Sequence, residues 1–122
     1  MMLNILTIDD SRMMRQMLML TLKGAGHAVY QAADGMEGLD ALQEHLGFDL
    51  IITDINMPRL DGFGFIERAR TLPQCKATPI LVLSTESSDE KKARARAAGA
   101  SGWIVKPFNA DKLLSAVRRV AG

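Results

Sequence analysis

Three aspartates follow short apolar runs, at positions where their carboxylates could do chemistry together. Asp9 and Asp10 come directly after residues 5–8, and Asp54 comes directly after residues 50–53. If these runs are parallel strands of one sheet, their carboxyl ends meet at the edge where α/β proteins bind ligands. Converging carboxylates raise each other's pKa unless a cation joins them. Hard oxygen ligands suit Mg²⁺, which completes its shell with water and phosphate, so the pattern predicts a magnesium-dependent phosphate site.

Two further polar pairs follow apolar runs in the same way. Ser84-Thr85 come after residues 80–83, and Lys106-Pro107 come after residues 103–105. A polar residue at any single strand end is ordinary, because such ends are solvated. Since four of the five apolar runs end in polar or charged residues, we interpret the set as one site. A carboxylate is already ionised at neutral pH, so the site needs a cation such as Lys106 rather than a general base to receive a phosphoryl group.

The elements that must position these residues can also be read from the pattern. The apolar runs are too short for buried helices and rich in branched residues, so they predict buried strands at 5–8, 28–30, 50–53, 80–83 and 103–105. Helical spacing between them predicts core-facing stripes at Met14, Met17, Leu18 and Leu22, at Leu39, Leu42 and Leu46, and at Leu113, Val117 and Val120. The alternation predicts an α/β fold: a doubly wound, five-stranded parallel sheet. The favoured strand order is 2-1-3-4-5, which is one of the common orders of doubly wound parallel sheets.

The fourth predicted helix, residues 88–98, differs from the others. We expect Ala93, Ala97 and Ala98 to face the core there. Alanine buries little apolar surface, and each Å² contributes only about 25 cal/mol. This helix is therefore predicted to be the most readily displaced of the five.

Composition limits the class of protein. The 122 residues are 48% hydrophobic and carry a net charge of +1, which fits one compact domain that does not bind nucleic acid by bulk attraction. No stretch reaches the roughly 20 apolar residues of a membrane span, and the first residues lack an export signal. The lone Cys75 cannot form an internal disulfide, and we assign it no role. We therefore expect a cytoplasmic monomer without membrane contact.

These motifs resemble the receiver domains of response regulators in two-component systems. The resemblance rests on Asp9-Asp10, the run from Asp54 to Gly62, Ser84 and Lys106-Pro107-Phe108, and it spans essentially the whole chain. It implies a flavodoxin-like (CheY-like) fold and one receiver domain over residues 1–122 without an output domain.

The resemblance also implies a role for each matching residue. Asp54 would be the phosphoacceptor, and Asp10, Asp54 and the backbone carbonyl of Asn56 would bind Mg²⁺, with Asp9 acting on the ion through water. Ser84 would be the switch hydroxyl. Lys106 would pair with Asp54 before phosphorylation and with a phosphoryl oxygen after it, and the Lys106-Pro107 bond would be cis.

Three other positions match modulators in that family. Asn56 and Glu86 would control how long the phosphoryl group survives; the alternative for both is that they are ordinary polar loop residues. Trp103 would be an aromatic switch, and the alternative is a plain core aromatic. Since it alternates with Ile104 along a strand, we expect a partly exposed indole near the fourth helix.

Several functions remain open. The stretches 84–88 and 99–103 resemble CheY-type chemotaxis regulators most closely, which implies a CheA-type histidine kinase as phosphodonor and the flagellar motor switch as target. A phosphate sink or relay intermediate would need the same site. Whether a dedicated phosphatase is a further partner is left open by the sequence. The basic run from Lys91 to Arg96 is either a solvated face or a docking surface.

Two classes of protein fit less well. A haloacid dehalogenase-like hydrolase needs a second acid where this chain has Asn56. A phosphorylation-dead module would not keep the acids, hydroxyl and lysine. The expected protein is thus a phosphoacceptor that catalyses only its own phosphorylation and slow dephosphorylation, not an enzyme acting on other substrates.

Overall fold

A computed structural model of the protein describes residues 2–45 and 47–121. Five parallel strands form one sheet in the order β2-β1-β3-β4-β5, which confirms the predicted order. The elements follow one another as β1 (Asn4–Ile8), α1 (Arg12–Gly24), β2 (Ala28–Ala32), α2 (Gly35–Glu44), β3 (Leu50–Thr53), α3 (Gly62–Thr71), a short 3₁₀ turn (Pro73–Cys75), β4 (Ile80–Ser84), α4 (Asp89–Ala98), β5 (Gly102–Val105) and α5 (Ala110–Ala121).

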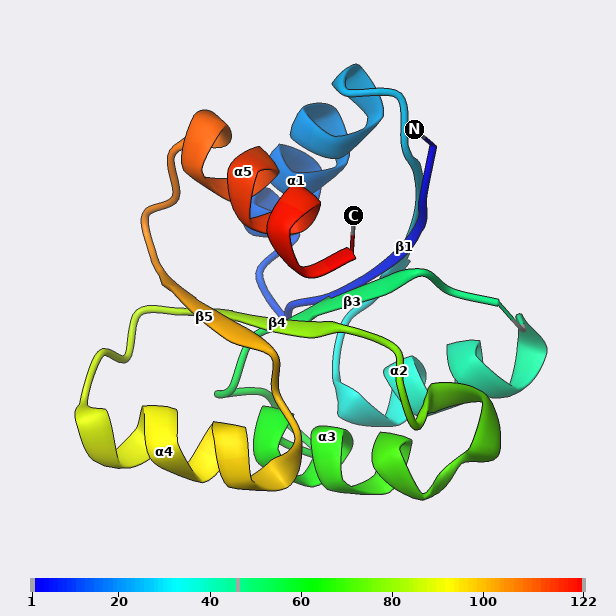
Figure 1. Ribbon diagram of the computed structural model, residues 1–122, viewed down its shortest axis with the longest axis vertical. Coiled ribbons are helices and arrows are strands. Elements are labelled where there is room, and N and C mark those ends of the chain that lie inside the picture. The colour runs from blue at the N-terminus through cyan, green and yellow to red at the C-terminus, as the bar shows by residue number, and fades with distance from the viewer. Residues whose placement is uncertain (1, 46, 122) are drawn as a thin grey trace.

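The helices form a layer on each face of the sheet. Helices α1 and α5 lie together on one face, and α2, α3 and α4 cover the other (Figure 1). The central strands β3 and β4 are buried along their whole length, as expected for strands covered on both faces. Two apolar cores result. One packs α1 and α5 on the sheet, and the other packs α2, α3 and α4.

Each helix begins next to the loop that leaves a strand, so the helix starts and the strand ends share one edge of the sheet. The side chains of Ser11, Asp34, Asp61 and Ser88 each accept a hydrogen bond from the amide three residues later. Asn109 accepts from the amides of Asp111 and Lys112, at 2.8 and 3.2 Å. These caps satisfy amides that have no partner within the helix, and they hold the loops that carry the polar residues.

Three predicted core positions are wrong. Met17 is 43% exposed, because Leu18 and Leu22 take the inward face of α1 and Met17 falls beside them. Ala93 and Ala97 are exposed, and Ala95 is the buried residue of α4. Ala98 does pack against the core as expected. Leu46, predicted as a core residue, lies outside the described residues.

Within residues 2–45 and 47–121, no helix combines the length and the apolar character that crossing a bilayer would require.

Candidate functional site

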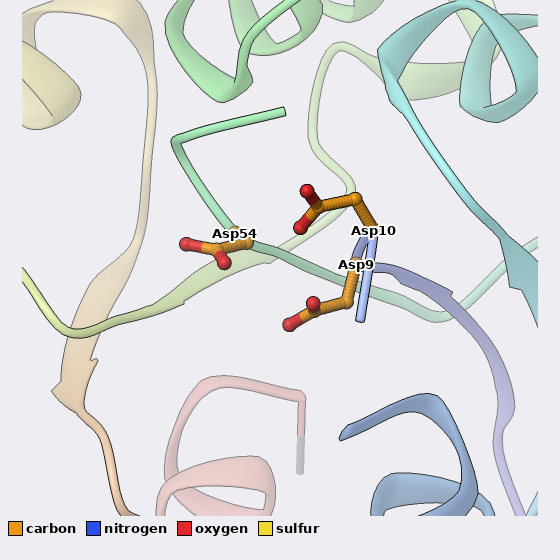
Figure 2. A group of neighbouring side chains, drawn as sticks. All are labelled: Asp9, Asp10 and Asp54. Atoms are coloured by element: carbon orange, nitrogen blue, oxygen red, sulfur yellow. The ribbon is translucent and has the colours of Figure 1, made fainter. Parts of the chain in front are cut away.

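The carboxyl ends of β1 and β3 bring the three aspartates together. Ile8 pairs with Thr53 in the sheet, and the Asp54 amide donates to the Ile8 carbonyl at 2.9 Å, so the residues that follow each strand are neighbours. Asp9 and Asp54 are buried, whereas Asp10 is exposed. One carboxylate oxygen from each lies within 4.8 Å of the other two, and Figure 2 shows the three side chains as neighbours at the strand ends. The predicted convergence is confirmed.

Lys106 reaches this cluster from the end of β5. Its Nζ donates to Asp9 Oδ2 and to Asp54 Oδ2, at 2.8 Å in each case, and its side chain is 10% exposed. Burial lowers the pKa of Lys106, but the hydrogen bonds to Asp54 and Asp9 outweigh burial and leave the pKa above its ordinary value. The ammonium therefore stays charged. The Lys106-Pro107 bond is cis, as expected.

Asp9 is held through both its carboxylate and its backbone. Its Oδ1 accepts from the Ser11 amide at 2.9 Å, and the guanidinium of Arg15 donates to its backbone carbonyl at 2.7 Å. Burial raises the pKa of Asp9, and the hydrogen bonds from Lys106 and Ser11 only partly offset that effect. An added cation would favour the ionised form of this carboxyl.

The donor set fits a hard divalent cation. Carboxylate oxygens are the ligands that Mg²⁺ prefers, and it usually takes only a few from the protein. Lys106 already binds one oxygen each of Asp9 and Asp54, so it compensates part of the acidic charge. Asp10 is exposed and points toward the space shared with Asp54 (Figure 2). Asp10 thus offers its oxygens on the solvent side of the cluster, next to the buried Asp54.

The loop after β4 links the buried hydroxyl to two other predicted residues. Ser84 is fully buried, and its Oγ accepts from the Glu86 amide at 3.2 Å. Glu86 Oε1 accepts from Asn56 Nδ2 at 3.3 Å, and the Glu86 carbonyl accepts from the Trp103 indole at 2.9 Å. Trp103 is half-buried and packs against the core on the α4 side, as predicted. One residue, Glu86, therefore contacts the other three.

Sequence reasoning missed two contacts near the site. Lys91 on α4 forms an ion pair with Glu86 at 3.0 Å, and this hydrogen bond, followed by that of Asn56, lowers the pKa of Glu86. Arg59 forms an ion pair with Asp34 at 2.8 Å. Neither contact could be predicted from nearby residues in the sequence. The spacing of Asp34 and Glu37 does match a helix capping box, but it does not identify Arg59 as a partner.

The arrangement suits a reaction with an anionic group. It combines the Asp54 carboxylate, the Lys106 ammonium and the buried Ser84 hydroxyl at the ends of three different strands, β3, β5 and β4. Preorganised charges of this kind stabilise transferring phosphoryl groups, for which positioning and electrostatics supply most of the catalysis.

Comparison with known proteins gives a consistent result. The family model of the response regulator receiver domain matches residues 5–118. The chemotaxis protein CheY4 of Vibrio cholerae has a similar structure, with 49% sequence identity and a TM-score of 0.94 over 98% of this chain and 99% of that chain. A CheY homolog of Campylobacter jejuni is 32% identical over 121 residues, which are 98% of this chain and 93% of that protein.

A third relative is much longer. The gliding motility regulatory protein of Myxococcus xanthus is 36% identical over 119 residues, 97% of this chain but 15% of that protein. The chain therefore spans a small part of some relatives and nearly the whole of others.

Proposed function

We propose that this chain, which belongs to the response regulator receiver domain family, accepts a phosphoryl group on Asp54 and thereby changes the surface that it offers to a protein partner. The observation that carries the proposal is the contact of Lys106 with both Asp54 and Asp9, at 2.8 Å, beside the third carboxylate of Asp10. A lysine so placed can exchange its bond to Asp54 for one to a phosphoryl oxygen without leaving the site.

The transfer itself needs little from the protein beyond positioning. A carboxylate oxygen of Asp54 attacks the phosphorus of a phosphohistidine, the new P–O bond forms as the P–N bond breaks, and the imidazole nitrogen keeps the electron pair. Lys106 neutralises part of the charge on the phosphoryl oxygens. A Mg²⁺ ion held by Asp10, Asp54 and the Asn56 carbonyl, with Asp9 acting through water, would neutralise the rest.

The buried hydroxyl gives the site a route to the surface. Ser84 Oγ accepts a hydrogen bond from the Glu86 amide, and its hydroxyl proton can be donated to a phosphoryl oxygen on Asp54, which would draw Ser84 toward Asp54 and away from that amide. Moving Ser84 would disturb the Glu86 carbonyl that holds the Trp103 indole. Trp103 then turns inward, and the surface formed by α4, β5 and α5 changes.

Asn56 and Glu86 border the solvent side of the site and are hydrogen-bonded to each other. We assign them the control of water attack on the acyl phosphate, so that their substitution changes the lifetime of the signal rather than the ability to accept phosphate.

The finer assignment is to chemotaxis. Similarity to CheY4 and to a CheY homolog supports a CheA-type histidine kinase as donor and the flagellar motor switch as target. On this proposal residues 1–122 act as one cytoplasmic, monomeric receiver domain. A phosphate sink or relay intermediate would use the same residues, and binding to the motor-switch protein that strengthens on phosphorylation separates the two functions.

Labelling experiments test the proposal. Radiolabelled acetyl phosphate or phosphorylated kinase should label the wild type in the presence of Mg²⁺ and not after chelation. Asp54→Asn should take no label, because an amide is neither a comparable nucleophile nor an anionic ligand. Asp49→Asn, at an exposed aspartate before β3, serves as the matched control and should be labelled normally. Equal labelling of both variants would contradict the assignment.

A further inference from the structure

The loop between Asp54 and α3 contains an unusual backbone conformation. Arg59 has φ of 66°, and it is the one residue other than glycine with a positive φ in the described ranges. Left-handed backbone is unfavourable for side chains other than those of glycine, asparagine and aspartate. An arginine in this conformation indicates that its side chain makes a contact that offsets the cost of the backbone strain.

That contact is a two-pronged ion pair with Asp34. Arg59 Nε donates to Asp34 Oδ2 at 2.8 Å, and Nη2 donates to Oδ1 at 3.1 Å. The Asp34 side chain is 8% exposed, whereas that of Arg59 is 57% exposed, so the arginine covers the carboxylate from outside. The hydrogen bond from Arg59 holds the pKa of Asp34 below its ordinary value. Bidentate arginine–carboxylate pairs fix orientation as well as distance.

Asp34 is itself firmly held. Its Oδ1 caps α2 by accepting from the Glu37 amide at 2.9 Å, and Glu37 Oε1 accepts in return from the Ala33 amide at 3.0 Å. Next to it the Gly35 amide donates to the Leu60 carbonyl at 3.2 Å, and a Cβ on Gly35 would lie 2.5 Å from that oxygen. The β2–α2 loop and the β3–α3 loop are therefore in direct backbone contact beside the ion pair.

The loop that carries Asn56 is thus fixed at two ends. At one end Asp54 continues from β3 and its Oδ1 accepts from the Ile55 amide at 2.7 Å. At the other end Arg59 is tied to Asp34. Asn56 lies between these anchors, and its backbone can move only as far as both allow.

We propose that Arg59 and Asp34 are positioning residues that hold the β3–α3 loop so that Asn56 faces the cluster of aspartates. The inference rests on the proposed function, since that function gives the Asn56 carbonyl to Mg²⁺ and the Asn56 side chain to the control of water. Neither Arg59 nor Asp34 touches the reacting atoms. They act through the loop between them.

Variants at the two positions separate the ion pair from the backbone conformation. Arg59→Asn keeps a residue that tolerates left-handed φ but cannot reach Asp34, and Asp34→Asn keeps a helix cap but loses the charge. Each single variant and the double variant are compared. Arg68→Ala is the matched control, because it removes another exposed arginine, which donates a 3.9 Å hydrogen bond to Met36 Sδ and lies outside the loop.

Two readouts are measured on the whole chain. The first is amide hydrogen exchange without Mg²⁺, which should rise about tenfold at Asn56 and its neighbours in the loop and stay unchanged in α5. The second is the Mg²⁺ affinity followed by Trp103 fluorescence, which should fall about tenfold, as when support for a metal ligand is lost. The double variant should resemble either single variant, because each single variant already removes the same Arg59–Asp34 ion pair. The control should change each value by less than about twofold.

The outcomes distinguish this inference from the proposed function. If Arg59→Asn leaves loop exchange at the wild-type rate, or if the two single variants simply add, the ion pair does not position the loop. Wild-type protein that neither binds Mg²⁺ nor accepts a phosphoryl group would overturn the proposed function, and amide exchange would still decide whether the ion pair orders the loop.

Discussion

Helices α4 and α5 flank the same strand, β5, but are held to the protein in different ways (Figure 1). Helix α5 buries Leu113, Ala116 and Val117 against α1 and the sheet. Helix α4 buries one residue, Ala95. Since stabilisation grows with buried apolar area, at about 25 cal/mol per Å², α5 is the firmly attached helix of the pair.

Helix α4 depends instead on charged side chains. Lys91 pairs with Glu86 at its first turn, and Arg94 lies 4.0 Å from the ring centroid of Phe63. At its end the Gly99 carbonyl accepts two hydrogen bonds from Arg70, at 2.7 and 3.2 Å. One of these contacts leads directly to the loop of Ser84 and Trp103. Helix α4 is therefore both the less buried of the two helices and the one with a direct contact to the loop of Ser84 and Trp103, and we expect it to move more readily than α5.

The largest expected effect tests the anchoring of α5. Leu113→Ala should lower the free energy of unfolding by about 2–5 kcal/mol, because it leaves a cavity in a fully buried position. Ala95→Gly on α4 should cost only about 1–2 kcal/mol, from lost helix propensity and one buried methyl group. Urea unfolding measures both. Equal losses would show that the two helices are anchored alike.

An intermediate effect concerns the switch. Beryllofluoride, an analogue of the phosphoryl group, should change Trp103 fluorescence and the hydrogen exchange of α4 but leave α5 unchanged. Ser84→Ala should reduce that response by about tenfold, since a hydrogen bond to a charged group contributes about 1.5–3 kcal/mol.

Thr85→Ala is the control for this variant, because Thr85 is the exposed neighbouring hydroxyl. If Ser84→Ala responds to beryllofluoride as the wild type does, or if Thr85→Ala loses the response instead, Ser84 is not the switch.

The smallest expected effect lies at the first turn of α4. Lys91→Ala should speed amide exchange there slightly at neutral pH, whereas Lys92→Ala, which removes the same charge, should not. Lys91 and then Asn56 depress the pKa of Glu86 in the folded protein. The stabilisation that the ionised Glu86 gives to this turn is therefore present above the ordinary pKa of Glu86, and it is lost as the pH falls through the lower pKa of the folded protein.

The two lysine variants should consequently converge at low pH. They should also converge at high salt, because the ion pair is solvent-exposed. A difference that persists under both conditions would mean that Lys91 acts by something other than its bond to Glu86.

The sequence predicted the sheet and the aspartate cluster because both depend on short-range patterns. Each apolar run became a strand, with boundaries shifted by at most two residues, and the polar residues at the strand ends met as expected. Parallel strands leave one geometry for such ends. The location of Ser84 and Lys106 at this edge could be predicted from their places at strand ends alone, since Ser84 ends β4 and Lys106 follows β5.

The errors have physical causes in local sequence. Helix α4 has alanines at 93, 95, 97 and 98, which point in several directions, so periodicity could not tell which face is inward. On α1, Met17 lies next to Leu18, and methionine is tolerated both in cores and on surfaces.

The ion pair of Arg59 with Asp34 could not be predicted for another reason. Its partners lie 25 residues apart, and the left-handed conformation of Arg59 is imposed by the folded loops rather than by its own preference. Contacts of this kind follow from tertiary structure, and a single sequence carries no signal for them.

The most direct test of the central claim identifies the modified atom. The protein is phosphorylated with acetyl phosphate and Mg²⁺ and treated with borohydride, which reduces an acyl phosphate to an alcohol and would convert the aspartate to homoserine. Mass spectrometry of the peptides then locates the change. We predict homoserine at position 54 and at no other aspartate. Homoserine at position 9 or 10, or a stable phosphate on Ser84, would contradict the account.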